Sequence, residues 1–322
     1  MKRIAILDDW QNQATHLADW SAVRAGAEVV FFQNAFADED EAAAKLADFD
    51  AVVAMRERTP FPERLLARLP RLKLLSFTGA RNAAIDIPGC TKHGVLVCYT
   101  TGKPATFATA ELALGLILAA ARQIALGDAE IRAGRFQQNT TPGIELMGKT
   151  LGVIGLGKLG GRLARFANAI GMNVIAWSQN LTDEAATEAG AVRVSKDELL
   201  ARSDVVSLHL VLSDRSRNTL GAAELAKLKD GAIVVNTSRA GLIDQSALLA
   251  EVQKRRIVAA LDVYAQEPLA SDDPWRTAPN TVLTPHLGYV TQGNMAGLYT
   301  ESAENLAAWL AGAPIRTLNE VP

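Results

Sequence analysis

Short apolar runs rich in β-branched residues alternate with helix-like stretches along the first hundred residues. Continuous apolar runs of four to eight residues are typical of parallel strands that are buried on both faces. The stretches between them, such as Glu39–Phe49 and Pro62–Leu69, have helical spacing. Strands that alternate with helices favour a doubly wound α/β fold. The strands predicted here are Arg3–Leu7, Glu28–Phe32, Ala51–Met55, Lys73–Phe77 and Gly94–Cys98.

A second alternating series follows a polar break at Thr100–Pro104 and a long apolar helix that ends near Arg122. The last helical stretch, Thr291–Ala311, has no strand after it, so we expect it to return to the first series. The chain is therefore predicted to hold one domain at residues 102–290, inserted into another formed by residues 1–101 and 291–322. The later strands are predicted at Thr150–Ile154, Asn173–Trp177, Val205–His209, Ala232–Asn236, Val258–Asp262 and Thr281–Thr284.

The composition narrows the class of protein and its partners. A chain of 322 residues with 49% hydrophobic and 21% charged residues is typical of a globular protein with two cores. The net charge of -2 gives no general attraction to nucleic acid or to an anionic membrane. Cys90 and Cys98 are too few for a disulfide framework, and Ile4–Leu7 is too short for a secretory signal. We expect a reduced, cytoplasmic protein that binds neither nucleic acid nor membrane.

A glycine-rich turn directly follows the strand Thr150–Ile154 and precedes a helical stretch at Arg162–Ile170. In such a turn the first glycine allows the sharp bend, the second lets the backbone approach a pyrophosphate, and the third lets helix pack on strand. The free N–H groups at the start of the helix then attract the phosphates. The pattern predicts that residues 102–290 bind a dinucleotide. The expected contacts in the turn are Gly155, Gly157, Lys158, Leu159 and Gly160.

The end of the next strand bears on the choice of cofactor. About 20 residues beyond the turn, NAD enzymes usually place an acid that accepts hydrogen bonds from the ribose 2′-hydroxyl. Here Ser178 occupies that place, followed by Gln179 and Asn180. A serine can donate to a 2′-phosphate that a carboxylate would repel, although no arginine is adjacent in the sequence. We favour NADP over NAD, and NAD stays the alternative.

Three later strand ends carry residues suited to hydride chemistry on a hydroxy acid. Arg239 can hold a carboxylate through two parallel hydrogen bonds, or it simply caps the strand at the surface. His286 suits an acid/base role because its unperturbed pKa lies near neutral pH. A buried carboxylate beside a histidine fixes its tautomer, and Glu267 is the candidate partner.

These segments together resemble the D-isomer-specific 2-hydroxyacid dehydrogenases. The resemblance rests on the glycine turn, on Asn236–Arg239, on Asp262–Pro268, on Thr284–His286 and on Ala110–Ala113 in the long helix. It implies two doubly wound parallel-sheet domains, with a Rossmann-type nucleotide domain inserted into a flavodoxin-like substrate domain. It also implies a homodimer, formed largely through the helix that begins near Ala105.

The resemblance also assigns roles to individual residues. Arg239 would bind the substrate carboxylate and polarise the keto oxygen, His286 would be the acid/base, and Glu267 would tune it. Asp262 would hold the nicotinamide carboxamide. No metal is expected. The loop predicted to bind the substrate carboxylate is Gly79, Ala80 and Arg81, and the remaining predicted cofactor contacts are Thr109, Ser178, Gln179, His209, Thr237, Ser238, Asp262 and Gly288.

Two departures from the family pattern concern the substrate. Arg81 stands where glycine is common, and it either brings charge to the pocket or points outward. Tyr289 stands where small residues are usual, and it either narrows the pocket, stacks on ligand or merely packs. We favour an NAD(P)H-dependent reductase of a small 2-keto acid such as glyoxylate or hydroxypyruvate. The alternatives are a dinucleotide-sensing, corepressor-like binding protein, and a related dehydrogenase acting on phosphoglycerate or phosphite.

Overall fold

In the computed structural model, which describes residues 1–101 and 107–321, the first apolar runs form a five-stranded parallel sheet in the order β2-β1-β3-β4-β5. This order is that of flavodoxin-like folds. The register places Ile4 of β1 opposite Val29 of β2 and Ala51 of β3. The strands are β1 (Lys2–Ile6), β2 (Ala27–Phe31), β3 (Ala51–Ala54), β4 (Leu74–Phe77) and β5 (Leu96–Tyr99).

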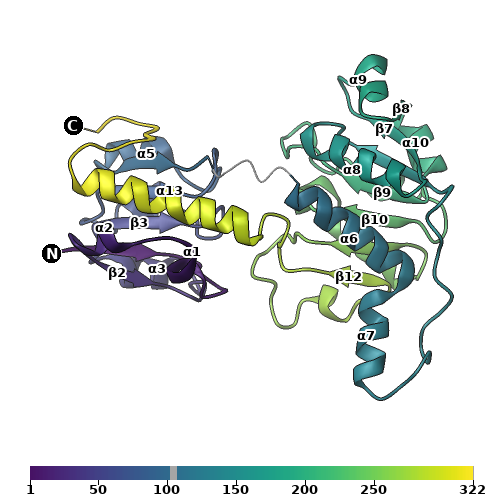
Figure 1. Ribbon diagram of the computed structural model, residues 1–322, viewed down its shortest axis with the longest axis horizontal. Helices are drawn as coiled ribbons and strands as arrows, with labels where there is room; N and C mark the ends of the chain where they lie inside the picture. The colour runs from purple at the N-terminus through teal and green to yellow at the C-terminus, as the bar shows by residue number, and fades with distance from the viewer. Residues whose placement is uncertain (102–106, 322) are drawn as a thin grey trace. The chain divides into compact units, whose positions relative to one another are not determined.

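Helices cover both faces of this sheet, and one of them comes from the end of the chain. The last helix, α13 (Gln292–Leu310), packs against β4 and the two N-terminal helices (Figure 1). Its buried Asn305 donates through Nδ2 to Ser76 Oγ of β4 at 3.1 Å. The opposite face is filled by Leu46, Leu65 and their neighbours. The remaining helices are α1 (Ala14–Leu17), α2 (Ser21–Arg24), α3 (Glu39–Leu46), α4 (Glu63–Leu66) and α5 (Ile87–Lys92).

The later apolar runs form a seven-stranded parallel sheet in the order β12-β11-β10-β9-β6-β7-β8. Counted from β6, this is the dinucleotide-binding order 3-2-1-4-5-6 with one strand added. The strand order reverses between β6 and β9, which pair directly. The predicted fold class is confirmed. The strands are β6 (Thr150–Ile154), β7 (Asn173–Trp177), β8 (Val192–Arg193), β9 (Val205–Leu208), β10 (Ile233–Asn236), β11 (Val258–Leu261) and β12 (Thr281–Leu283).

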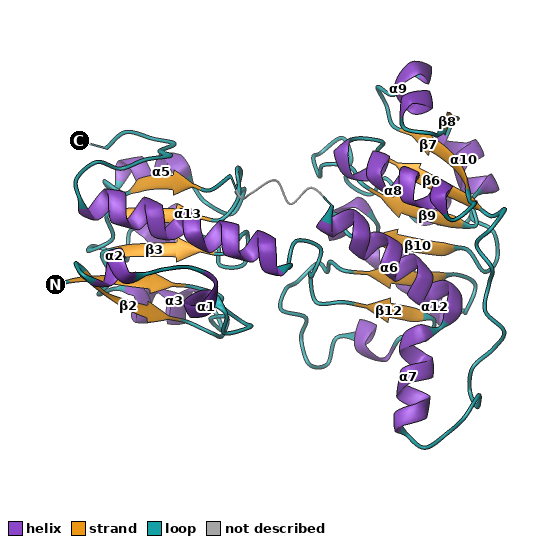
Figure 2. Ribbon diagram, viewed as in Figure 1, coloured by secondary structure: helices purple, strands orange, loops and turns teal. Residues whose placement is uncertain are grey.

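Helices flank this second sheet (Figure 2), and two separate apolar cores lie on its two faces. Side chains of α6 and α8, such as Ile117 and Leu163, build one core. Side chains of α10, α11 and α12, such as Leu199 and Leu248, build the other. The helices are α6 (Ala108–Arg122), α7 (Ile124–Arg132), α8 (Lys158–Ala169), α9 (Asp183–Glu188), α10 (Lys196–Arg202), α11 (Ala222–Leu225) and α12 (Gln245–Gln253), with 3-10 turns at Ala240–Leu242 and Pro274–Thr277.

Several elements differ from the sequence prediction, each for a local reason. Helix α8 begins at Lys158, earlier than the predicted Arg162, because Gly160 and Gly161 are helical here despite their low helix propensity. Strand β8 was not predicted, since its two residues are exposed and lack an alternating pattern. Helix α7 follows a break at Gln123, which adopts a left-handed conformation with φ 51°.

The described residues group into two units by their contacts. The first unit comprises the described residues of Met1–Ala105 and Thr291–Pro322, and the second comprises those of Thr106–Val290. The predicted boundary at residue 102 and the predicted helix start near Ala105 lie outside the described residues. In the part of the chain that the structure describes, no single helix is long and apolar enough to cross a membrane; α6 and α7 would meet the length and composition only as a pair, and they are bent by 63°.

Candidate active site

Six strand ends of the second unit carry the residues that the sequence singles out. Because all seven strands are parallel, their carboxyl ends meet at one edge of the sheet, which is where open α/β sheets bind ligands. The structure therefore gathers these residues along a single edge. The glycine turn follows β6, Ser178 follows β7, His209 follows β9, Thr237, Ser238 and Arg239 follow β10, Asp262 and Glu267 follow β11, and His286 follows β12.

The glycine turn has the geometry that a dinucleotide requires. Gly155 has φ 99°, and a Cβ there would lie 2.8 Å from the carbonyl carbon of His209. A Cβ on Gly160 would lie 2.2 Å from the carbonyl oxygen of Gly155. At Gly157, the N-cap of α8, nothing stands within 4 Å of an added Cβ, and no side chain caps the helix. The turn thus leaves open space and free N–H groups where a phosphate would approach.

Two buried polar atoms at this edge lack partners among the described residues: His209 Nδ1 and Thr237 Oγ1. The Nε2 atom of His209 already bonds Ser207 Oγ at 2.9 Å. Part of His209 reaches the surface, yet its ring nitrogen Nδ1 is buried, and burial lowers the pKa of this histidine to about 4. Buried polar atoms without partners are uncommon in native proteins. Both atoms therefore fit a polar ligand such as a dinucleotide at this edge.

His286 and Glu267, predicted as a pair, are in direct contact. The imidazole Nδ1 lies 2.6 Å from Glu267 Oε2, and each side chain is about a quarter exposed, at 24% and 25%. Burial by itself would raise the pKa of Glu267. The hydrogen bond to His286 and the positive charges of His286 and Arg239 outweigh it, so the pKa lies below its usual value. Glu267 is therefore ionised at neutral pH, and a carboxylate only accepts, which makes Nδ1 the donor.

The loop that carries His286 is braced by the buried carboxylate of Asp262. This carboxylate accepts hydrogen bonds from Thr284 Oγ1 at 2.6 Å, from the Leu287 N–H at 2.7 Å and from the Gly288 N–H at 2.8 Å. The carbonyl of Gly288 in turn accepts from Thr109 Oγ1 of α6 at 2.8 Å. Burial raises the pKa of Asp262, although these hydrogen bonds oppose the effect. Asp262 thus positions the loop that carries His286, and its predicted contact with the nicotinamide stays a prediction.

His286 also contacts the aromatic ring that the sequence left unassigned. Its imidazole meets the ring of Tyr289 edge to face, with centroids 5.7 Å apart. The backbone of His286 is left-handed, with φ 54°, a conformation in which histidine, like asparagine and aspartate, is more frequent than other non-glycine residues. The contact with Tyr289 and the bond to Glu267 together hold the imidazole at one orientation.

Arg239 follows β10 on a short turn that Asn236 holds in place. Asn236 Nδ2 donates to the Arg239 carbonyl at 2.9 Å, and its Oδ1 accepts from the Ser238 N–H at 3.0 Å. Ser238 Oγ donates to the carbonyl of Leu208 on the adjacent strand β9 at 2.8 Å. Arg239 is half-buried, and its Nη1 donates to the Ser238 carbonyl at 2.8 Å. The guanidinium is therefore anchored close enough to Glu267 to lower its pKa.

The first unit presents the predicted substrate loop at the carboxyl end of β4. Gly79 has φ 111°, and a Cβ there would lie 1.9 Å from Nη1 of Arg56. The Gly79 N–H donates to Thr100 Oγ1 at 2.9 Å, whereas Ala80 and Arg81 are exposed. Sequence reasoning missed Arg56, which follows the neighbouring strand β3. Its backbone N–H bonds Thr78 Oγ1 at 2.9 Å, so the loop is built around it.

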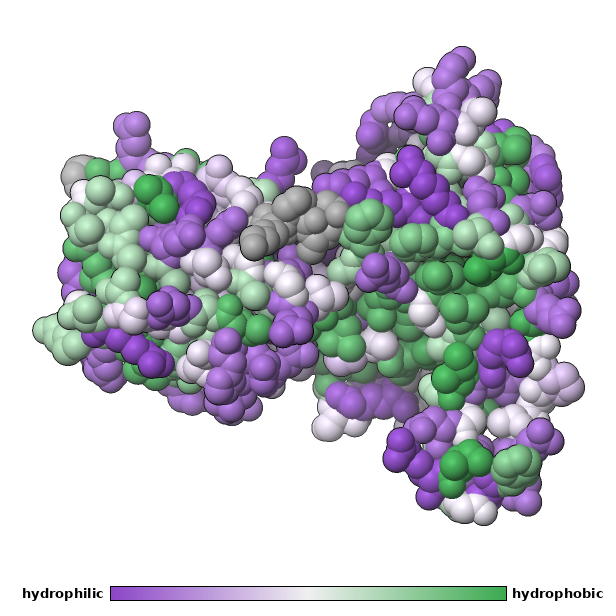
Figure 3. All heavy atoms as spheres, viewed as in Figure 1, coloured by the Kyte–Doolittle hydropathy of each residue, from purple (hydrophilic) through white to green (hydrophobic). Residues whose placement is uncertain are grey.

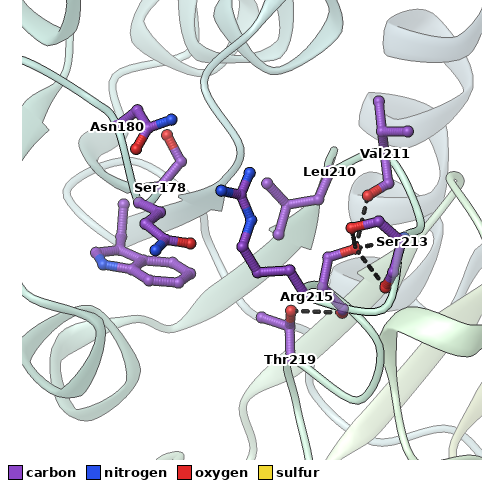
Figure 4. Close-up of a pocket in the computed structure, with 10 residues that line it drawn as sticks. Ser178, Asn180, Leu210, Val211, Ser213, Arg215 and Thr219 are labelled. Carbon is purple, nitrogen blue, oxygen red and sulfur yellow. Dashed lines mark hydrogen bonds between the residues drawn. The ribbon is translucent and has the colours of Figure 1, made fainter.

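Sequence reasoning also missed a second arginine. Ser178, Gln179 and Asn180 line a cavity of about 400 Å³ together with Arg215, which lies on the segment after β9 (Figure 4). Arg215 lies 37 residues beyond Ser178 in the sequence. Its place in this cavity could not be predicted, because a loop residue belongs to no periodic pattern. Lys158 and Leu159 lie in the first turn of α8, with Lys158 exposed.

Comparison with known proteins places this geometry in a family. Residues 114–288 match the model of the D-isomer specific 2-hydroxyacid dehydrogenase NAD binding domain. The chain is 35% identical to a D-3-phosphoglycerate dehydrogenase of Archaeoglobus fulgidus over 85% of its own length and 52% of that protein. It is 38% identical to a glyoxylate reductase of Aeropyrum pernix over 77% of its length and 76% of that protein.

The fold likeness extends over nearly the whole chain. A crystal structure of a phosphoglycerate oxidoreductase from Vibrio cholerae matches with a TM-score of 0.91 and 38% identity, over 97% of this chain and 100% of that one. The chain spans about half the length of the phosphoglycerate dehydrogenases that it matches among curated proteins.

Proposed function

Because the chain belongs to the D-isomer-specific 2-hydroxyacid dehydrogenase family, we propose that it interconverts a small 2-keto acid and its 2-hydroxy acid with a nicotinamide dinucleotide. When bound, the nicotinamide supplies or accepts the hydride. The observation that carries the proposal is the contact of 2.6 Å between His286 Nδ1 and Glu267 Oε2. This pair lies on the same sheet edge as the glycine turn.

The proton is handled by His286. Because Nδ1 donates to the ionised Glu267, Nε2 is the ring atom left to exchange a proton with the substrate oxygen. In reduction the protonated imidazole gives this proton to the keto oxygen, and in oxidation the neutral ring removes it from the hydroxyl. Glu267 remains ionised throughout, so it stabilises the imidazolium and keeps the ring in one tautomer.

The substrate is oriented by guanidinium and backbone N–H groups. Arg239 is anchored by the turn at Asn236, and a planar guanidinium is suited to bind a carboxylate and to polarise the keto oxygen. In the first unit, the loop Gly79–Arg81 offers an anion the backbone N–H groups of Ala80 and Arg81, since the Gly79 N–H already donates to Thr100 Oγ1. A second candidate substrate carries a further anion, as phosphoglycerate does. It is favoured by Arg56 and Arg81, which sit at the ends of neighbouring strands β3 and β4.

A panel of keto acids tests the proposal directly. The full chain would be assayed with glyoxylate, hydroxypyruvate, pyruvate and 3-phosphohydroxypyruvate, each with NADPH and with NADH, by the loss of nicotinamide absorbance. We expect reduction of at least one of the small acids, with glyoxylate or hydroxypyruvate preferred. A marked preference for the phosphorylated acid would assign the chain to the second candidate. Tight dinucleotide binding without turnover of any acid would contradict an enzyme and support the binding-protein alternative.

Apolar side chains gather on the surface over α6 of the second unit (Figure 3), and α7 and the following segment continue this surface. Exposed apolar patches of this kind usually mark an interface.

We infer that a second copy of the chain covers this apolar surface, giving a homodimer. Sedimentation should show the mass of two chains, and the double substitution Ile124→Glu and Ile131→Glu should reduce it to one. A single-chain mass for the unaltered protein at micromolar concentration would contradict this. The exposed residues are Leu118, Ile124, Leu126, Ile131 and Phe136.

A further inference from the structure

The cavity beside Ser178 is enclosed by two segments of the second unit. One is the turn after β7, which contributes Ser178 and Asn180, and the other is the loop after β9, which contributes Arg215. Figure 4 shows the guanidinium of Arg215 extending into the space between the Ser178 turn and the stretch that carries Ser213 and Thr219. The cavity measures about 400 Å³, which is large enough to hold part of a nucleotide but not a whole dinucleotide.

The loop that carries Arg215 is held rigid by its own hydrogen bonds. Ser216 Oγ donates to the Val211 carbonyl at 2.7 Å and accepts from the Ser213 N–H at 2.8 Å. Thr219 Oγ1 donates to the Ser216 carbonyl at 2.7 Å. These bonds close the loop on both sides of Arg215. Its Cα position is therefore fixed without any contribution from the guanidinium.

The cavity offers hydrogen-bond donors and one positive charge, with no negatively charged residue among those that line it. The side chains of Ser178, Gln179 and Asn180 are neutral, and Arg215 is the only ionisable residue in the lining. Within residues 1–101 and 107–321, the Arg215 guanidinium makes no ion pair and no hydrogen bond. A guanidinium held on a rigid loop beside neutral donors is suited to bind a phosphate in a bidentate manner.

The position of Ser178 identifies which phosphate this would be. Ser178 directly follows β7, the neighbour of the glycine-turn strand β6, and the residue at this strand end faces the 2′ position of the adenosine ribose. We propose that Ser178, Asn180 and Arg215 form the binding site for the 2′-phosphate of NADP. This inference rests on the proposed function, because it assumes that the glycine turn holds a nicotinamide dinucleotide.

The cavity should bind a phosphate more tightly than a free hydroxyl. A phosphate monoester carries a charge of about -1.5 to -2 at neutral pH, and a hydrogen bond to such a group strengthens binding by about 10- to 100-fold. A ribose hydroxyl offers Arg215 no charge. NAD would leave the donors of the cavity facing water, whereas NADP would place its extra anion among them.

The test measures binding of a cofactor fragment and needs no turnover. Calorimetry on the full chain would compare 2′,5′-ADP with 5′-AMP, which differ only in the 2′-phosphate. We expect 2′,5′-ADP to bind at least about 10-fold more tightly, the factor that corresponds to the lower end of such a charged hydrogen bond. Raising the salt concentration should reduce the difference, because the contact is partly exposed.

Two substitutions and a matched control assign the effect to Arg215. Arg215→Gln should weaken the binding of 2′,5′-ADP by about 10- to 100-fold and leave the affinity for 5′-AMP unchanged. Arg217→Gln is the control, because Arg217 is an exposed arginine on the same loop whose Nη1 lies beside Gly241, outside the cavity. It should change neither affinity. Ser178→Asp should reverse the preference between NADPH and NADH, as followed by nicotinamide fluorescence.

The outcomes separate this inference from the proposed function. Equal binding of 2′,5′-ADP and 5′-AMP by a chain that reduces a keto acid would overturn the 2′-phosphate site and leave the function standing. Selective binding of 2′,5′-ADP by a chain that reduces no keto acid would keep the site and overturn the function. An equal loss of affinity for both nucleotides in Arg215→Gln would show that Arg215 contacts the adenosine instead, which would also overturn the inference.

Discussion

Replacing His286 by alanine should lower the turnover of the preferred 2-keto acid by a factor of about 10²–10⁴, the contribution typical of a positioned general acid. The substitution removes the proposed acid/base group, and it leaves Glu267 without its imidazole partner. Dinucleotide binding should persist, because the glycine turn after β6 does not involve His286. Steady-state kinetics and nicotinamide fluorescence would measure the two effects separately.

Two further variants separate chemistry from folding. His286 has φ 54°, so alanine there adds backbone strain that asparagine tolerates better. His286→Asn should therefore lose the same turnover while unfolding at the temperature of the unaltered chain. His16→Ala replaces an exposed histidine on α1 and should leave turnover unchanged. Full activity in either His286 variant would remove this residue from the mechanism.

Replacing Gly160 by alanine should damage both the stability of the second unit and its affinity for a dinucleotide. The added Cβ would lie 2.2 Å from the Gly155 carbonyl oxygen, closer than real Cβ atoms approach any neighbour. The start of α8 and the turn after β6 must then separate by about 1 Å. Overpacking of this kind costs about 1–3 kcal/mol, which lowers the unfolding temperature of a unit of this size by several degrees.

Neighbouring glycines provide matched controls for this effect. A Cβ on Gly161 would meet Ala189 at an ordinary 3.8 Å, so Gly161→Ala should leave binding unchanged and, because alanine favours a helix over glycine by about 0.5–1 kcal/mol, should not lower stability. A Cβ on Gly157 would meet nothing within 4 Å, and its φ of -82° suits alanine. Gly157→Ala should leave the unfolding temperature unchanged but weaken the binding of the dinucleotide, because the backbone there is expected to approach the pyrophosphate. Unchanged stability and binding in Gly160→Ala would contradict the packing argument.

The pairing of His286 with Glu267 shows what strand-end reasoning achieves. The two residues are 19 positions apart, yet they follow β11 and β12, which pair in parallel. Neighbouring parallel strands bring their carboxyl ends together, so the contact follows from the strand prediction. The bracing role of Asp262 does not follow in the same way. Its three hydrogen bonds depend on how the backbone of Leu287 and Gly288 turns back toward β11, and no sequence pattern specifies that turn.

The sequence by itself determined the α/β fold, the dinucleotide turn and the strand ends that carry Arg239, Glu267 and His286. It could do so because apolar periodicity fixes the strands and the glycine spacing fixes the turn. Only the tertiary structure decided that Arg215 shares a cavity with Ser178. That relation depends on the strand order, which sets β6 between β7 and β9, and on the hydrogen bonds of Ser216 that set the path of the loop. Contacts between loops distant in sequence carry no periodic signal, and the proposed 2′-phosphate site therefore depends on a residue that only folding brings to Ser178.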